Sequence, residues 1–249
     1  MADRSAIEWT EATWNPTTGC DRTSPGCDHC YALTLARRLK AIGQPKYQLD
    51  GDPRTSGPGF GLTTHPGTLD IPKRWISPRT IFVNSMSDLF HDQVPFEFIA
   101  DVFRVMEATP QHTYQVLTKR SRRLVDLADQ LPWSPNVWMG VSIETARYAF
   151  RAAHLATVPA AVRFLSLEPM IGPMNELDLN GIHWVIAGGE SGSGARPIEE
   201  EWVAGVRDHC VAEGVPFFFK QWGGRTPKAG GRELDGRTWD EVPEVVAIH

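Results

Sequence analysis

The chain has 249 residues, of which 41% are hydrophobic and 22% charged, and its formal net charge is −5. This composition is ordinary for a globular protein and excludes a chain that is mainly disordered. The net charge argues against a surface that is basic throughout, although a local basic groove remains compatible with it. The sequence has neither an apolar run long enough for a membrane helix nor an apolar leader at its start, so we expect a cytoplasmic protein without membrane spans.

Apolar and β-branched runs recur along the chain and predict seven strands. The first run, within residues 9–19, is a weak candidate. The stronger runs are residues 80–85, 113–118, 136–142, 162–167, 184–189 and 216–221. Several of them are apolar almost throughout, which is typical of strands that are covered on both faces.

Helical patterns alternate with these runs. Apolar residues recur at helical spacing within residues 30–42, 95–108, 121–131, 146–157 and 198–213, and Gly214 is suited to end the last helix. This alternation predicts βαβ units and a parallel sheet in an α/β protein. Seven strands favour a full or partial (β/α) barrel of the TIM type over residues 1–224. A doubly wound sheet is the alternative, but the glycine fingerprint of dinucleotide-binding folds is missing.

Two segments do not follow the alternation. Residues 43–79 are rich in Gly and Pro and predict an insertion without a long helix, with a short hairpin near residues 60–69. Loops of this length in compact domains are usually functional lids or disordered. Residues 225–249 predict an irregular C-terminal tail.

Polar side chains follow nearly every predicted strand at its C-terminal end. They are Asn84, Ser85, Ser87, Asp88, Thr118, Lys119, Arg120, Ser142, Glu144, Ser166, Glu168, Glu190, Ser191, Lys220 and Gln221. The strands of a parallel barrel point the same way, so these groups should converge on the rim where such folds build active sites. An unpaired carboxylate in a buried position is costly, so Glu144, Glu168 and Glu190 each need a cation, a donor or a ligand. The alternative to a functional role is a structural ion-pair network with the basic residues of the same rim.

Three of the four cysteines, Cys20, Cys27 and Cys30, lie in one loop between the first strand and the first helix. In a chain without an export signal, such clustering indicates a metal or redox centre rather than a disulfide framework. Three thiolates from one loop can bind three irons of a [4Fe–4S] cluster and leave the fourth iron open to a cofactor or substrate. Cys210 falls within a predicted helix, where we expect a small core residue.

A structural zinc site is the main alternative for this loop. Zinc takes four ligands, so His29, Asp21 or Cys210 would have to join the three cysteines. His29 lies inside the Cys27–Cys30 pair and would be a strained fourth ligand. A redox-active C-x-x-C pair is a poorer alternative, because a third cysteine precedes it and the chain lacks a thioredoxin-like layout.

The cysteine loop and several later segments resemble one known family. The segments are residues 14–32, 82–90, 117–120, 140–144, 166–169, 188–192 and 220–224. They resemble the phage-borne three-Cys-motif family, which is radical-SAM-like and distantly similar to spore photoproduct lyase, and the resemblance extends from about residue 5 to 224. It implies a radical-SAM-like barrel, a [4Fe–4S] cluster on Cys20, Cys27 and Cys30, and S-adenosylmethionine (SAM) on the open iron.

The resemblance also implies a reaction. One electron from the reduced cluster cleaves the sulfonium of SAM, and the 5′-deoxyadenosyl radical abstracts hydrogen from a substrate, as a lyase or transferase would require. By position, it implies SAM contacts from Ser85, Ser87, Asp88, Lys119, Ser142, Glu144, Glu168 and Glu190. The sequence departs from the usual radical-SAM pattern, which spaces its cysteines by three residues and then two and has an aromatic residue where His29 stands.

Basic residues interleaved with aromatic ones favour a nucleic acid substrate, because single-stranded or flipped-out nucleotides need both charge neutralisation and stacking. The residues are Arg37, Arg38, Lys40, Lys73, Arg74, Lys119, Arg120, Arg122 and Arg123, with Trp75, Trp133, Trp138 and Trp222. The leading hypothesis is therefore radical repair or modification of DNA, with an electron donor as a further partner. The alternatives are a radical SAM enzyme for a peptide or small molecule, and a non-catalytic zinc or iron–sulfur module.

Overall fold

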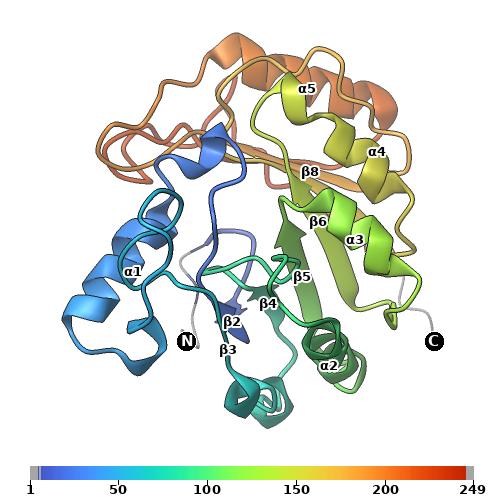
Figure 1. The fold of residues 1–249 in the computed structure, drawn as a ribbon. Helices are drawn as coiled ribbons and strands as arrows, with labels where there is room; N and C mark the ends of the chain where they lie inside the picture. The colour runs from blue at the N-terminus through green and yellow to red at the C-terminus, as the bar shows by residue number, and fades with distance from the viewer. Residues whose placement is uncertain (1–4, 6, 245–249) are drawn as a thin grey trace.

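The computed structural model describes residue 5 and residues 7–244. Its main sheet holds seven strands in the order of the sequence, and every neighbouring pair is parallel. They are β1 (Ala12–Trp14), β4 (Thr80–Val83), β5 (Thr113–Thr118), β6 (Val137–Ser142), β7 (Val162–Leu167), β8 (Trp184–Gly188) and β9 (Phe217–Gln221). The sheet curls, but β1 and β9 are not paired with each other, so it forms a partial (β/α) barrel (Figure 1). A doubly wound sheet would reverse its strand order at one point, so that alternative is wrong.

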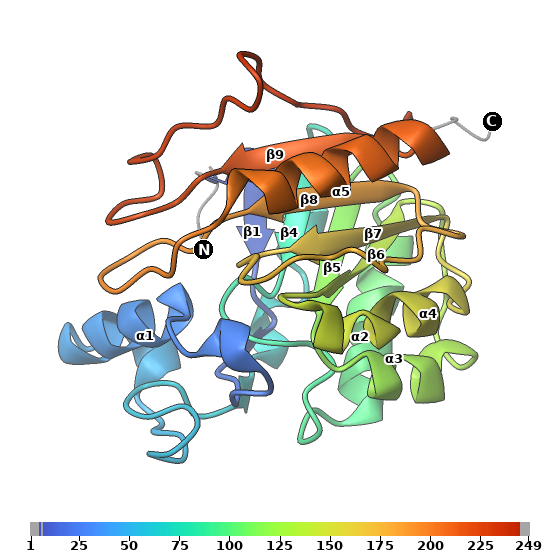
Figure 2. The ribbon, with the colours of Figure 1, turned by 90° about the horizontal axis from the view of Figure 1, so that it is seen from above.

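Five α-helices accompany the sheet in the described part of the chain. They are α1 (Tyr31–Ala41), α2 (Phe96–Glu107), α3 (Ser121–Ala128), α4 (Phe150–Ala156) and α5 (Glu200–Glu213). All five fall within the ranges predicted from the sequence, and α5 ends at Gly214, whose φ of 68° is left-handed and suits glycine. Helix α1 lies apart from the other four (Figure 2). None of the helices in residues 7–244 is long and apolar enough to cross a membrane.

The strands separate two apolar layers because successive side chains point to opposite faces of a sheet. Ile81 and Val83 of β4 join the large core that also contains the apolar faces of the helices. Phe82, between them, joins a second cluster with Trp9, Trp138, Phe164, Trp184, Ile186 and Phe218. This second cluster fills the concave side of the half-barrel with aromatic rings, as the continuous apolar runs in the sequence predicted.

The insertion over residues 43–79 differs in one respect from its prediction. It contains only short 3₁₀ turns and the two-residue strand β3 (Thr63–Thr64), but no hairpin forms within residues 60–69. Instead β3 pairs antiparallel with β2 (Thr17–Thr18), just before the cysteine loop. The chain turns into a 3₁₀ helix at Pro66–Thr68, so no second strand is available locally and the free backbone groups pair with β2.

The tail after residue 224 is irregular but covers the free edge of β9. The amide of Phe219 donates to the carbonyl of Trp239 over 2.9 Å, and the amide of Glu241 donates to the carbonyl of Phe217 over 3.2 Å. Leu234 and Trp239 are buried and join the large core. An uncovered edge strand would offer unpaired backbone groups to other chains, so the tail completes the sheet.

Candidate functional site

A cavity of about 1110 Å³ opens at the C-terminal ends of the parallel strands. Every strand of the sheet contributes a lining residue at or next to its C-terminal end. These are Asn15, Asn84, Lys119, Ser142, Glu168, Glu190 and Lys220, in the order of the strands. Trp9 and Phe82 of the aromatic cluster also line the cavity, as do Thr226, Pro227 and Lys228 of the tail. The cavity is therefore polar at its rim and aromatic where it meets the interior of the half-barrel.

All three thiols of the cysteine loop line this same cavity, and each of the three residues is half-buried. Burial raises the pKa of the Cys20 thiol to about 12 and also raises the pKa of Cys30. The free thiols of Cys20 and Cys30 are therefore neutral, and a bound metal would be needed to hold them as thiolates. Cys210 is fully buried in α5, as predicted, and lies away from the cavity.

Seven of the eight residues expected to contact a cofactor line the cavity, and Glu144 is the exception. Its side chain is fully buried behind the wall. Oε1 accepts hydrogen bonds from the Ser24 hydroxyl over 2.6 Å and from the Lys119 ammonium, and Oε2 accepts one from Arg151 over 3.1 Å. Burial would raise the pKa of Glu144, but the two cations outweigh it and the pKa is lowered. Glu144 is thus ionised, and it links the end of β6 to the cysteine loop.

Glu190 forms a second link to the same loop through hydrogen bonds. It accepts hydrogen bonds from Arg196 at 2.6 and 3.0 Å and from the His29 ring at 2.9 Å. Arg196 also donates to the carbonyl of Pro25 over 2.9 Å. Burial favours the neutral acid, yet the hydrogen bonds from Arg196 and His29 prevail and lower the pKa of Glu190 to about 2. This carboxylate is therefore ionised and mostly engaged by the protein itself.

Glu168 and Lys220 face each other across the concave side of the sheet. The Lys220 ammonium donates to Glu168 Oε1 over 2.8 Å, and both side chains are partly exposed to the cavity. A Cβ at Gly188 would come within 2.9 Å of the same carboxylate oxygen, so the glycine leaves room for the pair. Of the three rim glutamates, Glu168 has the most exposed side chain, at 15% against 4% for Glu190 and 0% for Glu144.

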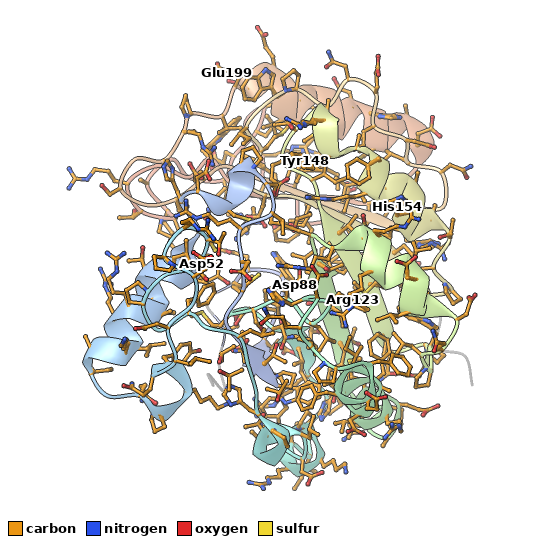
Figure 3. The ribbon with its side chains drawn as sticks, in the orientation of Figure 1. Asp52, Asp88, Arg123, Tyr148, His154 and Glu199 are labelled. Carbon is orange, nitrogen blue, oxygen red and sulfur yellow. The ribbon has the colours of Figure 1, made fainter. Side chains whose placement is uncertain are left out.

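Asp88 and Arg120 form a fourth polar group beside Cys20. Both oxygens of Asp88 accept hydrogen bonds, Oδ1 from the Phe90 amide and Thr118 hydroxyl and Oδ2 from the Lys119 amide and Arg120 guanidinium. Asp88 lies near the centre of the molecule in the view of Figure 3. Its oxygens are thus already occupied by protein donors.

Sequence reasoning missed several residues that hold the loop. Ser24, Arg151 and Arg196 belong to no sequence motif. Their roles become visible only from the carboxylates that they contact in the structure. The predicted pairing of Lys119 and Lys220 with rim glutamates occurs, but Arg120 pairs with Asp88 instead.

The basic and aromatic residues expected to contact nucleic acid are dispersed. Among them only Lys119 and Arg120 line the cavity. Trp75 and Trp138 are buried core residues, and Arg123 donates to the carbonyls of His91 and Val94. Two exposed cations that the sequence did not single out, Arg22 and Lys228, line the cavity.

Comparison with known proteins gives a family and one distant structural likeness. A solved structure described as spore photoproduct lyase complexed with dinucleoside spore photoproduct is 13% identical, with a TM-score of 0.41. The match covers 69% of this chain and 54% of the lyase chain, so the chain spans about half the length of that protein. No curated protein matches the sequence.

The family model described as "Protein of unknown function (DUF5131)" matches residues 4–243, which is nearly the whole chain. The match includes the cysteine loop, every strand end of the rim and most of the tail. The chain therefore belongs to the DUF5131 family.

Proposed function

We propose that this protein is a radical-SAM-type iron–sulfur enzyme in which Cys20, Cys27 and Cys30 hold a [4Fe–4S] cluster. The observation that carries the proposal is the position of these three thiols on the wall of a cavity at the C-terminal rim of a parallel half-barrel. Three thiolates satisfy three irons and leave one iron for a cofactor. The donor set therefore fits a site-open cluster that faces the cavity.

The same geometry gives little support to a structural zinc site. Zinc needs four ligands around one ion, with bonds to sulfur of about 2.3 Å. Within the described residues no three His, Cys, Asp or Glu side chains form a group that could hold a single ion. Of the fourth ligands considered from the sequence, Cys210 is buried in α5 and His29 is bonded to Glu190. Asp21 is bonded to Thr55, Ser56 and His91.

When bound, a reduced cluster supplies the electron that splits SAM into methionine and a 5′-deoxyadenosyl radical. The chain's own part is to position the reactants and exclude water. The Lys220–Glu168 pair offers one cation and one anion to the charged methionyl end of SAM, and the hydroxyls of Ser85 and Ser142 offer further contacts. Trp9 and Phe82 present an apolar floor. The proposed reaction also needs an external electron donor that reduces the cluster.

We propose a nucleic acid, in a single-stranded or flipped-out form, as the substrate. Arg22 and Lys228 are exposed residues of the cavity lining. Lys228 makes no ion pair with any residue in the described part of the chain, and Arg22 has only a long contact of 4.0 Å to Asp28. Exposed cations that are unpaired or only weakly paired, at a cavity with an aromatic floor, suit the binding of a phosphate whose base enters the cavity.

The test is anaerobic reconstitution with iron and sulfide, followed by metal analysis and incubation with SAM and dithionite. We expect a brown protein with close to four irons per chain, which releases 5′-deoxyadenosine. Cys20→Ala, Cys27→Ala and Cys30→Ala should each lose the cluster, and Cys210→Ala, the matched control, should retain it. A colourless protein with one tightly bound zinc would overturn the proposal in favour of a non-catalytic module. An intact cluster that yields no 5′-deoxyadenosine would refute radical initiation.

A further inference from the structure

The three cysteine sulfurs are not equivalent in their surroundings. Arg120 Nη1 donates a hydrogen bond to Cys20 Sγ over 3.3 Å, so Cys20 has a charged donor. The side-chain hydrogen-bond contacts of Cys27 within the described residues are with the hydroxyls of Thr23 and Ser24, both at 3.9 Å. Among the described residues no side chain donates a hydrogen bond to the sulfur of Cys30. Cys20 therefore has a charged hydrogen-bond donor, whereas Lys119 acts on Cys30 through its charge alone.

The guanidinium of Arg120 is held rigidly in this position. Nη1 also donates to Asp88 Oδ2 over 3.0 Å, and Nη2 donates to the carbonyl of Asp21 over 3.3 Å. Its side chain is only 9% exposed and that of Asp88 is 7% exposed. Interactions between charges are less screened in such buried surroundings than at an exposed surface, so both charges act on Cys20.

Asp88 is itself fixed by three donors besides Arg120. The Thr118 hydroxyl donates to Oδ1 over 2.7 Å, and the backbone amides of Phe90 and Lys119 donate to Oδ1 and Oδ2 over 3.0 and 3.1 Å. Thr118 is the last residue of β5, and Lys119 belongs to the turn between β5 and α3 that also carries Arg120. Asp88 therefore holds its negative charge beside the guanidinium and offsets part of the positive charge.

We infer that Arg120 raises the reduction potential of the proposed cluster through its hydrogen bond to the Cys20 sulfur, and that the negative charge of Asp88 offsets part of this effect. The inference rests on the proposed function. Reduction adds one negative charge to a cluster, so a nearby cation stabilises the reduced state and a nearby anion destabilises it. Arg120 and Asp88 thus have opposite effects on one measurable quantity, the midpoint potential of the cluster.

The experiment is a redox titration of the reconstituted full-length protein, without SAM, followed by the EPR signal of the reduced cluster. Arg120→Gln should shift the midpoint potential to more negative values, and Asp88→Asn should shift it to more positive values. Arg122→Gln is the matched control, because Arg122 lies two residues from Arg120 but is 81% exposed and paired with Asp126. The control should leave the midpoint potential unchanged.

Opposite shifts distinguish this inference from a merely structural role, which would alter both variants in the same way. Midpoints that do not move, or that move in one direction in both variants, would overturn it. If Arg120→Gln does not retain iron, Asp88→Asn decides alone, and a negative or absent shift contradicts the inference. Absence of iron from the reconstituted wild-type protein would instead refute the proposed function.

Discussion

Every rim glutamate has at least one basic partner, and these partners lie between 6 and 161 positions away in the chain. Glu144 meets Lys119 and Arg151, Glu168 meets Lys220, and Glu190 meets Arg196 and His29. Removing one partner of a buried pair leaves an uncompensated charge and is strongly destabilising. The pairs around Glu144 and Glu190 both end on the cysteine loop, so they fix the loop as well as satisfy the charges.

Gly26 of the cysteine loop should not tolerate a side chain. A Cβ there would come within 2.3 Å of Cγ and 2.9 Å of Cδ of Glu144, whose carboxylate is held by two cations. Gly26→Ala should therefore lower the free energy of unfolding by about 1–3 kcal/mol and reduce the iron content. Denaturant unfolding measures the first effect. Gly205→Ala, in α5 with open space around it, is the control and should stabilise by about 0.5–1 kcal/mol.

Glu190 should make the stability of the protein depend on pH in the acid range. Its pKa is lowered from 4.5 to about 2 in the folded protein. A lowered pKa means that the ionised group stabilises the fold above about pH 4.5 and that this contribution disappears as the pH falls towards about 2. Glu190→Gln should be less stable at pH 7 and should show a flatter decline. Urea unfolding from pH 7 to pH 3 tests this, and equal slopes for both proteins would contradict it.

At the scale of elements, the longer strands and the helices could be predicted directly from the sequence. Apolar runs located the six longer strands, and helical spacing located the five helices, because both patterns reflect which faces of an element are buried. The strand pairing of the insertion was harder to predict from the sequence. The partner of β3 comes from residues 17–18, across the long α1 segment, and nothing in the local sequence specifies that pairing. The helix expected over residues 146–157 divides into a 3₁₀ turn at Ala146–Tyr148 and α4.

The tail should contribute strongly to stability although it forms no regular element. Trp239 is 8% exposed, packs edge-on against Phe217, and lies under the guanidinium of Arg237. Trp239→Ala should cost about 3–5 kcal/mol of unfolding free energy, measurable by thermal or denaturant unfolding. Ile76→Ala, at a side chain that is 93% exposed, is the control and should have almost no effect. A Trp239 variant as stable as this control would show that the tail does not support β9.

The molecule as a whole combines a net charge of −5 with two unpaired or weakly paired cations at the cavity. A nucleic acid should therefore bind at the mouth of the cavity and not over the whole surface. Two phosphate contacts predict that log K for a single-stranded oligonucleotide falls with log salt concentration at a slope of about −1.4.

Arg22→Gln and Lys228→Gln should each reduce the steepness of this slope by about 0.7. Fluorescence anisotropy across a salt series gives the slopes, with Arg37→Gln on α1 as the control because Arg37 is exposed and lies outside the cavity lining. Unchanged slopes in both variants, or no binding at all, would favour a peptide or small-molecule substrate.

Patterns along the chain were enough to predict the α/β class, the parallel strands, the order of the elements and the isolation of Cys210 from the other three cysteines. These properties depend on local patterns of burial and on spacing along the chain. Three further properties became visible in the folded chain alone: the barrel is open, Glu144 lies behind the cavity wall, and Arg120 contacts Cys20. Such contacts join residues that are distant in the chain, here 100 positions apart for Arg120 and Cys20. They follow from how the strands are placed in space, because side chains that never meet along the chain become neighbours where strands end together.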